Sequence, residues 1–241
     1  MTINNAIVLC SGGFDSVITA YHVKKQNPKK IIILFFDYNQ RPLKEELYCA
    51  KKTAKSLNAE FKIIKLPWLG ELSTSIINKN KEFKPTTDND LKDIKKSKED
   101  IINWWVPTRN TIFLTAALAL AESLFLNTKE KYDIYIGLKS EGQIHFKDTT
   151  PEFINEMNNL VNFATNDGNY NIIAPFLDKD KDELAKIGLE LNVPFQCTYS
   201  CYIENGFKKN ISIHCGKCLN CVLRKKAFYW SNIKDPTLYK N

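Results

Sequence analysis

The stretch SGGFDS, residues 11–16, decides the fold, because it follows the apolar run 6–10 and leads at once into a helical pattern. Two glycines let backbone N–H groups turn toward an anion, and two Ser hydroxyls and a helix N-terminus add further donors. The Lys-Ser/Thr pair of the kinase-type loop is missing, as are the three spaced glycines of the dinucleotide fingerprint. We therefore predict a phosphate-binding loop between the first strand and the first helix. The alternative is a plain turn with a Ser or Asp cap.

Short β-branched runs alternate with longer helical patterns along the chain, as in βαβ units that build a parallel sheet. The expected strands are residues 6–10, 31–36, 61–66, 134–136 and 172–174. The expected helices, with apolar residues at helical spacing, are 15–26, 43–58, 108–127, 151–166 and 180–192. This order predicts an α/β fold with a doubly wound, five-stranded parallel sheet, whose ligands lie at the carboxyl ends of the strands.

Composition sets the broad class of the protein. The chain has 241 residues, 44% of them apolar and 25% charged, which excludes disordered and low-complexity classes. The apolar run 111–125 is broken by Glu122 and is shorter than the roughly 20 residues of a membrane span, so we expect a buried helix. The first residues lack the pattern of a secretory signal, which favours a cytoplasmic protein without a membrane segment. A net charge of +7 favours anionic partners, although its lysines are widely spread.

A polar, charge-rich stretch at residues 79–100 has no apolar period. We expect an exposed, mobile insertion there, which could act as a lid or could be a solvated loop.

The C-terminal part is rich in cysteine. Of seven cysteines, four lie between residues 201 and 221, and this clustering indicates metal binding in a reducing compartment. Cys215, Cys218 and Cys221 form two overlapping Cys-x-x-Cys turns, and one more ligand would complete a closed tetrahedral zinc site. Three residues compete for that fourth position: Cys201, Cys197 and His214. An iron–sulfur cluster and a catalytic Cys pair are the alternatives. We expect a nucleotide-binding domain at 1–194 and a metal-stapled unit at 195–241.

Two further motifs restrict the families that the chain can resemble. Residues 36–41 read FDYNQR with Glu45, Glu46 and Leu47 beyond them, and residues 106–110 read VPTRN. SGGFDS after an N-terminal strand is similar to the pyrophosphate loop of the ATP pyrophosphatase (PP-loop) superfamily. The other motifs and the cysteine tail resemble the patterns of the 7-cyano-7-deazaguanine synthase (QueC-like) family, in the same order and over nearly the whole chain.

The resemblance implies an adenine nucleotide alpha hydrolase-like fold and an ATP-dependent ligase that forms AMP and pyrophosphate. In this family 7-carboxy-7-deazaguanine is adenylated, ammonia displaces AMP to give an amide, and a second adenylation dehydrates the amide to the nitrile 7-cyano-7-deazaguanine. The implied cofactors are ATP, Mg²⁺ and a structural Zn²⁺, and the implied assembly is a homodimer. The alternatives are a divergent paralogue that joins a related carboxylate to a protein amine or nucleic acid, a PP-loop tRNA-modifying enzyme and, lowest, a non-enzymatic zinc-ribbon binding module.

The resemblance also assigns roles to individual residues. The implied catalytic residues are Asp15, Ser16, Arg109 and Lys181, with Asp15 also beside Mg²⁺. The implied nucleotide-binding residues are Ser11, Gly12, Gly13, Phe14, Asp15, Ser16, Phe36, Gln40, Arg41 and Asn110. The implied substrate residues are Arg41, Gly137 and Asp148. The implied metal ligands are Cys201, Cys215, Cys218 and Cys221, with Cys201 in the position of the family's Thr-Trp-Ser-Cys-Tyr stretch.

One segment departs from the family. Residues 138–150 lack its Tyr-Pro and Cys-Arg features, although Gly137 and Asp148 keep their places. Losing a hydrogen-bond partner of a buried base typically costs about 1–3 kcal/mol, so we expect a shift in substrate or acceptor. The residues expected at an entrance for a larger acceptor are Lys139, His145 and Lys147, with His145 alternatively an exposed loop residue.

Overall fold

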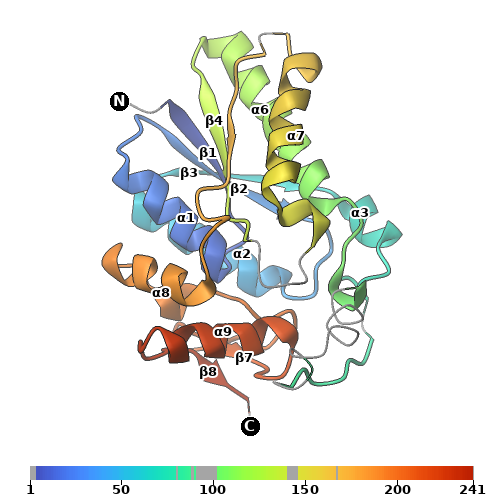
Figure 1. Ribbon diagram of the computed structural model, residues 1–241, viewed down its shortest axis with the longest axis vertical. Coiled ribbons are helices and arrows are strands. Elements are labelled where there is room, and N and C mark those ends of the chain that lie inside the picture. Colours follow the sequence, from blue (N-terminus) through green and yellow to red (C-terminus); the bar gives the residue numbers. More distant parts are fainter. Residues whose placement is uncertain are drawn as a thin grey trace.

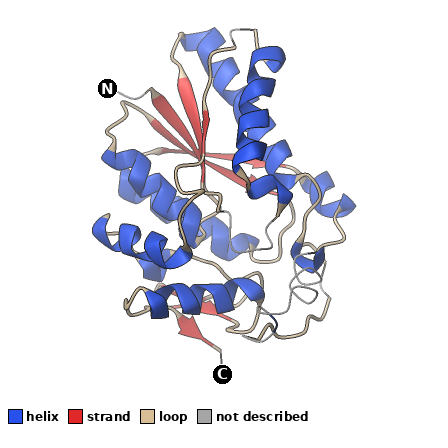
Figure 2. Cartoon of the chain, viewed as in Figure 1, coloured by secondary structure: helices blue, strands red, loops and turns tan. Residues whose placement is uncertain are grey.

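Five short apolar strands form a parallel sheet in the computed structural model, which describes residues 4–79, 81–87, 90, 102–139, 146–166 and 168–240. The strands are β1 (Asn5–Leu9), β2 (Ile31–Asp37), β3 (Glu60–Lys65), β4 (Tyr132–Ile136) and β5 (Ile172–Ile173). Their order is β3-β2-β1-β4-β5, and every neighbouring pair is parallel (Figures 1 and 2). The predicted doubly wound, five-stranded sheet is confirmed.

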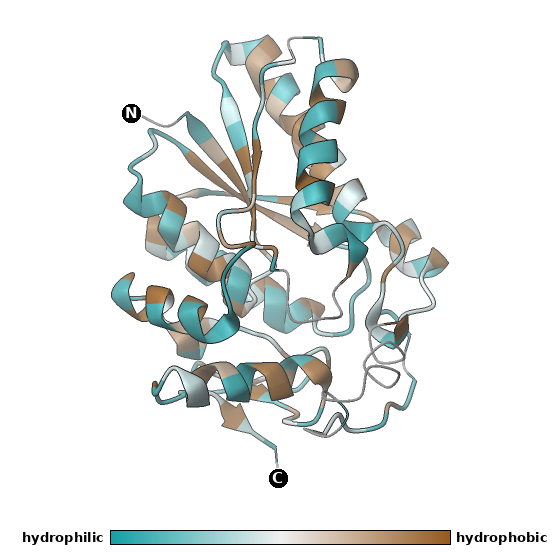
Figure 3. Cartoon of the chain, viewed as in Figure 1, coloured by the Kyte–Doolittle hydropathy of each residue, from teal (hydrophilic) through white to brown (hydrophobic). Residues whose placement is uncertain are grey.

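Helices cover both faces of the sheet (Figure 1). One face carries α1 (Phe14–Lys25), α2 (Leu43–Leu57) and α8 (Lys181–Glu190), and the other carries α6 (Arg109–Thr128) and α7 (Pro151–Ala164). Alternate residues of β1 point to opposite sides: Ala6 and Val8 join the α1 and α8 core, and Ile7 joins the α6 and α7 core. Because both faces are buried, the central strands are apolar along most of their length (Figure 3). Each helix begins and ends within two residues of its expected bounds.

The helix expected at 111–125 is present, and it is buried on one face. The buried residues of α6 lie on one face and are Asn110, Leu114, Ala117, Leu118 and Ala121. Small Ala side chains let this face approach β1 and β4 closely, while Leu126 on another face is 54% exposed. Within the described residues, Ile102–Thr128 is the one stretch whose length and apolar composition alone would suit a membrane span.

Beyond α8 the chain forms a small unit whose strands were not predicted from sequence, whereas the cysteine-rich pattern did predict a helix near residues 222–230. The unit contains β6 (Phe207–Lys208), β7 (Ile211–His214), α9 (Leu219–Trp230) and β8 (Leu238–Tyr239), with the strand order β6-β7-β8. The Phe14 ring of α1 stacks on Phe195 at 5.5 Å and meets Phe228 edge-on at 5.6 Å. The unit therefore shares its core with the start of α1. A short helix missed from sequence, α3 (Pro67–Leu72), follows β3.

The predicted insertion and entrance fall partly outside the described residues. Of residues 79–100 the structure describes 79, 81–87 and 90, and His145 lies outside it. Thr86 is buried, and its N–H donates to the Lys217 carbonyl at 2.9 Å. Most of the described residues of this stretch are exposed, as expected, and Thr86 alone among them is buried and attached to the cysteine unit.

Candidate active site

The loop after β1 leaves the start of α1 open. Gly13 is the N-cap residue, and among the described side chains none caps the helix. The Ser11 and Ser16 hydroxyls lie 3.2 Å apart, and the Gly13 N–H donates to Ser11 Oγ at 3.2 Å. The alternative of a turn closed by a Ser or Asp cap is therefore wrong. The first N–H groups of α1 stay available for an anion.

Two glycines allow close approach around this loop. Gly12 has φ +79°, and a Cβ there would overlap the Glu46 carbonyl oxygen of α2. At Gly137, after β4, a Cβ would lie 2.9 Å from Thr19 Oγ1 and 3.0 Å from the Asp15 carbonyl oxygen. Both positions therefore need glycine for packing, which places α2 and the end of β4 directly beside the loop.

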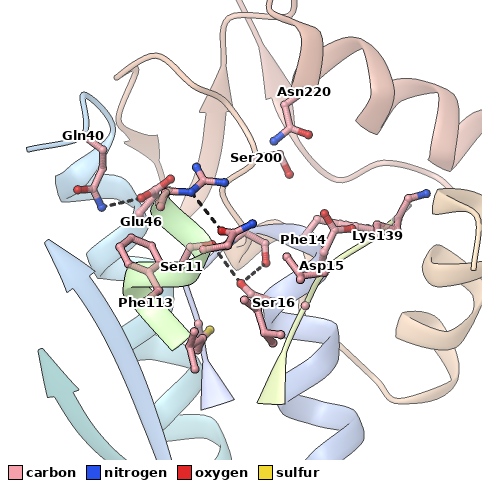
Figure 4. A pocket seen from close by; sticks show the side chains of 18 of the residues that line it. Ser11, Phe14, Asp15, Ser16, Gln40, Glu46, Phe113, Lys139, Ser200 and Asn220 are labelled. Atoms are coloured by element: carbon pink, nitrogen blue, oxygen red, sulfur yellow. Dashed lines mark hydrogen bonds between the residues drawn. The ribbon is translucent and has the colours of Figure 1, made fainter. Parts of the chain in front are cut away.

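A cavity of about 270 Å³ opens at the carboxyl ends of the central strands, above the loop (Figure 4). It brings together most of the residues expected from sequence: Ser11, Gly13, Phe14, Asp15, Ser16, Phe36, Gln40, Arg109, Asn110, Gly137 and Lys181. Gly12 does not line the cavity and instead packs against α2. The doubly wound sheet thus places its cavity where ligands of such sheets bind.

Lys181 and Asp15 face each other at the end of the cavity formed by the start of α1. Lys181 Nζ lies 3.7 Å from Asp15 Oδ2 and donates to Asn220 Oδ1 at 3.1 Å. The other carboxylate oxygen, Asp15 Oδ1, is buried and has no hydrogen-bond partner in the described structure. A buried, unpartnered carboxylate oxygen is suited to a cation.

Arg109 lies at another wall of the cavity, at the start of α6. Its Nε donates to Asn110 Oδ1 at 3.3 Å, and Asn110 Nδ2 donates to the Asp148 carbonyl oxygen at 3.2 Å. Burial raises the pKa of the Asp148 carboxyl, while the Arg109 charge acts in the opposite direction. Burial also raises the pKa of Tyr38 to about 12, so its phenol beside Arg109 stays protonated. This arrangement keeps the guanidinium in place near the cavity.

Aromatic rings line the part of the cavity away from the loop. Phe36 and Phe113 stack with centroids 4.1 Å apart and an interplanar angle of 4°, and Tyr38 meets Phe113 edge-on at 5.4 Å. Phe146, also at the cavity, stacks on Trp105 at 5.6 Å. Flat apolar walls of this kind suit a planar heterocycle.

Gln40 and Glu46 form a fixed polar pair beside these rings. Gln40 Oε1 accepts from the Tyr38 N–H at 2.9 Å, and Nε2 donates to the Phe36 carbonyl at 3.0 Å and to Glu46 Oε2 at 3.0 Å. Burial raises the pKa of Glu46 to about 7, although Gln40 and Arg109 act to lower it. Glu46 belongs to the motif at residues 36–47, and the family resemblance implied no role for it.

Besides Gly12, two expected site residues do not line the cavity. Arg41 points toward the cysteine unit, where its Nε lies 3.0 Å from Glu204 Oε2 and its Nη1 donates to the Lys81 carbonyl at 3.4 Å. Asp148 is buried behind Asn110. The structure therefore does not bring these side chains to the place where they were expected.

The four cysteines expected to bind metal do come together. Their sulfurs all lie within 4.8 Å of one another, with 3.8 Å between Cys215 and Cys221 and 4.0 Å between Cys218 and Cys201. A tetrahedron with Zn–S bonds of about 2.3 Å separates its sulfurs by about 3.8 Å, so the cluster could hold a zinc ion. Backbone N–H groups of Ile203, Cys215 and Cys218 donate to these sulfurs at 3.3–3.4 Å.

The other two candidates for the fourth ligand are placed elsewhere. His214 Nε2 accepts from the Ser200 N–H at 2.8 Å, and its ring stacks on Tyr199. Cys197 lies outside the four-sulfur group among the described residues. Geometry thus distinguishes Cys201 from its rivals, which spacing alone could not do.

With these features in place, the chain can be compared with known proteins. The family described as Queuosine biosynthesis protein QueC matches residues 5–232. The chain belongs to the QueC family. Its relatives include 7-cyano-7-deazaguanine synthase of Methanosphaera stadtmanae, 35% identical over 98% of each chain. The synthase of Methanococcus maripaludis is 36% identical over 97% of this chain and 98% of the relative. Among solved structures, NMN synthetase from Francisella tularensis aligns with a TM-score of 0.41 at 15% identity, over 95% of this chain and 84% of that one.

Several cavity residues of this QueC-family chain were not found from sequence. Those from the central motifs are Tyr38, Glu46 and Phe113, and those from the cysteine unit are Tyr199, Ser200, Tyr202, Leu219, Asn220 and Leu223. The sequence motifs linked the residues of the cysteine unit only to metal binding. The position of Asn220 between two zinc-type cysteines was a usable signal, because that spacing presents the intervening side chains on a rigid turn.

Proposed function

We propose that this enzyme converts 7-carboxy-7-deazaguanine and ammonia into 7-cyano-7-deazaguanine, consuming ATP and releasing AMP and pyrophosphate. Membership of the QueC family and the names of its relatives support this assignment. The observation that carries it is the single cavity in which an uncapped helix N-terminus with Ser11 and Lys181 adjoins flat aromatic walls. Such a cavity can hold a nucleotide phosphate chain and a planar base together.

The phosphate end would serve adenylation. Backbone N–H groups of the loop, the Ser11 hydroxyl and the Lys181 ammonium would hold the oxygens of the pyrophosphate as negative charge develops on them. Mg²⁺, when bound, would neutralise phosphate charge, and the unpartnered Asp15 Oδ1 is the protein oxygen that fits it. Arg109, held by Asn110, would contact an anionic oxygen of the nucleotide or of the substrate carboxylate.

The rest of the cavity would hold the deazapurine. Phe36 and Phe113 present apolar surface to a planar ring, and Gln40 and Glu46 lie beside them. Positioning the substrate carboxylate against ATP converts a rare encounter in water into a reaction within one complex. Loss of bulk water around the acyl adenylate would also protect it from hydrolysis.

The four-cysteine cluster would bind a structural zinc ion. All four coordination positions of such a site are filled by thiolates, so the ion would hold the C-terminal unit together without touching substrate. A homodimer, which the resemblance implies, and a cytoplasmic location, which the cysteine usage supports, complete the proposal.

The departure at 138–150 supports a second candidate, transfer of the acyl group to an amine larger than ammonia. Lys139 from this segment reaches the cavity (Figure 4). The test of both is to incubate the protein with ATP, Mg²⁺ and 7-carboxy-7-deazaguanine, with and without ammonia, and to measure AMP, pyrophosphate and the product mass. Nitrile formation that requires ammonia supports the synthase. AMP formation without amide or nitrile favours another acceptor, and no carboxylate-dependent AMP overturns both.

A further inference from the structure

The adenylation step proposed above leaves one carboxylate of the cavity without a task. Among the described residues that line the cavity, the acidic side chains are Asp15 and Glu46. Figure 4 shows them on opposite sides, with Asp15 beside Lys139 and Glu46 beside Gln40. Glu46 is therefore placed on the side of the cavity away from Asp15 and its partner Lys181.

The hydrogen bonds of Gln40 orient this carboxylate. Both ends of the Gln40 amide are committed, because Oε1 accepts the Tyr38 N–H and Nε2 donates to the Phe36 carbonyl. The amide can therefore present only a donor to Glu46 Oε2, at 3.0 Å. A carboxylate held from one side in this way keeps its other oxygen as an acceptor.

The neighbouring Glu45 shows what a purely structural carboxylate looks like here. It is buried, it does not line the cavity, and its Oε1 accepts the Gly206 N–H at 2.8 Å. Glu46, one residue later on α2, instead reaches the cavity wall. Burial raises the pKa of Glu46 to about 7, which lets its carboxyl both take and release a proton near neutral pH.

Amide formation needs such a group, because ammonia in neutral water is almost wholly ammonium, whose lone pair is used in an N–H bond. We propose that Glu46 is the site that binds this ammonium ion and removes one of its protons. The N–H bond breaks and the proton passes to the Glu46 carboxylate. The freed lone pair forms the C–N bond to the acyl adenylate, the C–O bond to AMP breaks, and the new C–NH₃⁺ group loses its extra proton to solvent. Glu46 then returns its own proton to solvent.

This inference rests on the proposed function, and the test compares two amines. Hydroxylamine is largely unprotonated at neutral pH, so it can attack the acyl adenylate without a base. Glu46→Gln should lower kcat/KM for ammonia by about 100-fold or more, the scale of general base catalysis. The same variant should lower kcat/KM for hydroxylamine by less than about fivefold. Glu45→Gln is the matched control and should change both values by less than about twofold.

The outcomes separate the inference from the proposed function. A wild-type enzyme that forms no amide with either amine overturns both. Suppose that the wild type is active and that Glu46→Gln lowers kcat/KM equally for both amines, or for neither. That result overturns the role of Glu46 alone. Should Glu46→Gln fail to fold, Glu46→Asp keeps a carboxylate on a shorter side chain. That variant should lose more activity with ammonia than with hydroxylamine, and equal losses would overturn the inference.

Discussion

The loop at residues 11–16 and the cysteine unit both line one cavity, but they are built by different means. The loop, residues 11–16, is a contiguous segment whose donors follow from local backbone geometry. The cysteine unit, from residue 195 onward, depends on Cys201 meeting a cluster that begins 14 residues later. The hydrogen-bond donors at the start of α1 thus come from a short, recognisable motif. The shape of the cavity depends in addition on a unit that a metal ion would stabilise.

The two regions are joined by direct contacts. The Tyr199 N–H donates to the Gly12 carbonyl at 2.8 Å, so the cysteine unit continues the loop. Arg224, fully buried, donates to Thr198 Oγ1 at 2.8 Å and lies over the Phe14 ring at 5.5 Å. Damage to the cysteine unit should therefore reach the loop, and the predictions below test that dependence from the largest effect to the smallest.

The largest effect is expected at the metal ligands. Cys218→Ser should remove the zinc ion and unfold the C-terminal unit, because structural zinc sites contribute roughly 10 kcal/mol or more to their local fold. Elemental analysis should find one zinc per wild-type chain and none in the variant, and thermal unfolding should begin far earlier. Cys197→Ser, outside the cluster, is the control and should be mild. Iron with sulfide in the purified protein would contradict this prediction.

The second largest effect should be on the rate of AMP formation, with the fold unchanged. Asp15→Asn should abolish AMP formation, with a loss of about 100-fold or more, because an uncharged amide cannot replace the carboxylate beside Lys181 and Mg²⁺. Thermal unfolding should match the wild type, since asparagine has the shape of aspartate and Asp15 Oδ1 has no hydrogen-bond partner in the described structure. Turnover equal to wild type would defeat the assignment of this end of the cavity to ATP.

Helix α2 touches both regions, and its Glu46 should make stability depend on pH. Its pKa of about 7 in the folded protein exceeds the ordinary value of 4.5, so its stabilising contribution is complete below about pH 4.5 and is lost as pH rises through 7. The loss is on the order of 3 kcal/mol. Between about pH 5 and pH 8, Glu46→Gln should therefore lose less unfolding free energy than the wild type in urea titrations. Equal losses of unfolding free energy in the two proteins would show that the pKa of Glu46 in the folded protein is the ordinary one.

The smallest effect should come from the hydrogen bond that joins Asn220 of the cysteine unit to Lys181 of α8, beside the loop. Asn220→Ala removes the acceptor of the Lys181 ammonium and should raise KM for ATP several-fold, consistent with about 1 kcal/mol for one such bond. Zinc content should stay at the wild-type level, because Cys218 and Cys221 are unchanged. A loss of zinc together with activity would instead show that Asn220 acts on the cluster.

Much of the fold could be predicted because its signals are local. The apolar runs of β1 and β2 and the glycines that follow β1 depend on residues adjacent in sequence. The cavity wall made by Tyr199 and Asn220 could not be predicted in the same way. Its position depends on packing between segments separated by more than 180 residues, as in the contact of Tyr199 with Gly12.

By itself, the sequence determined the phosphate loop, the parallel sheet and the set of cysteines, since each follows from short-range backbone geometry or spacing. Only the tertiary structure decided which side chains of the stretch 36–46 reach the cavity. Asn39 turns the backbone with φ +58°, after which Gln40 and Glu46 face inward and Arg41 pairs with Glu204, 163 residues away. The direction of a side chain after a strand depends on such a turn and on distant partners, and neither is written in the local pattern.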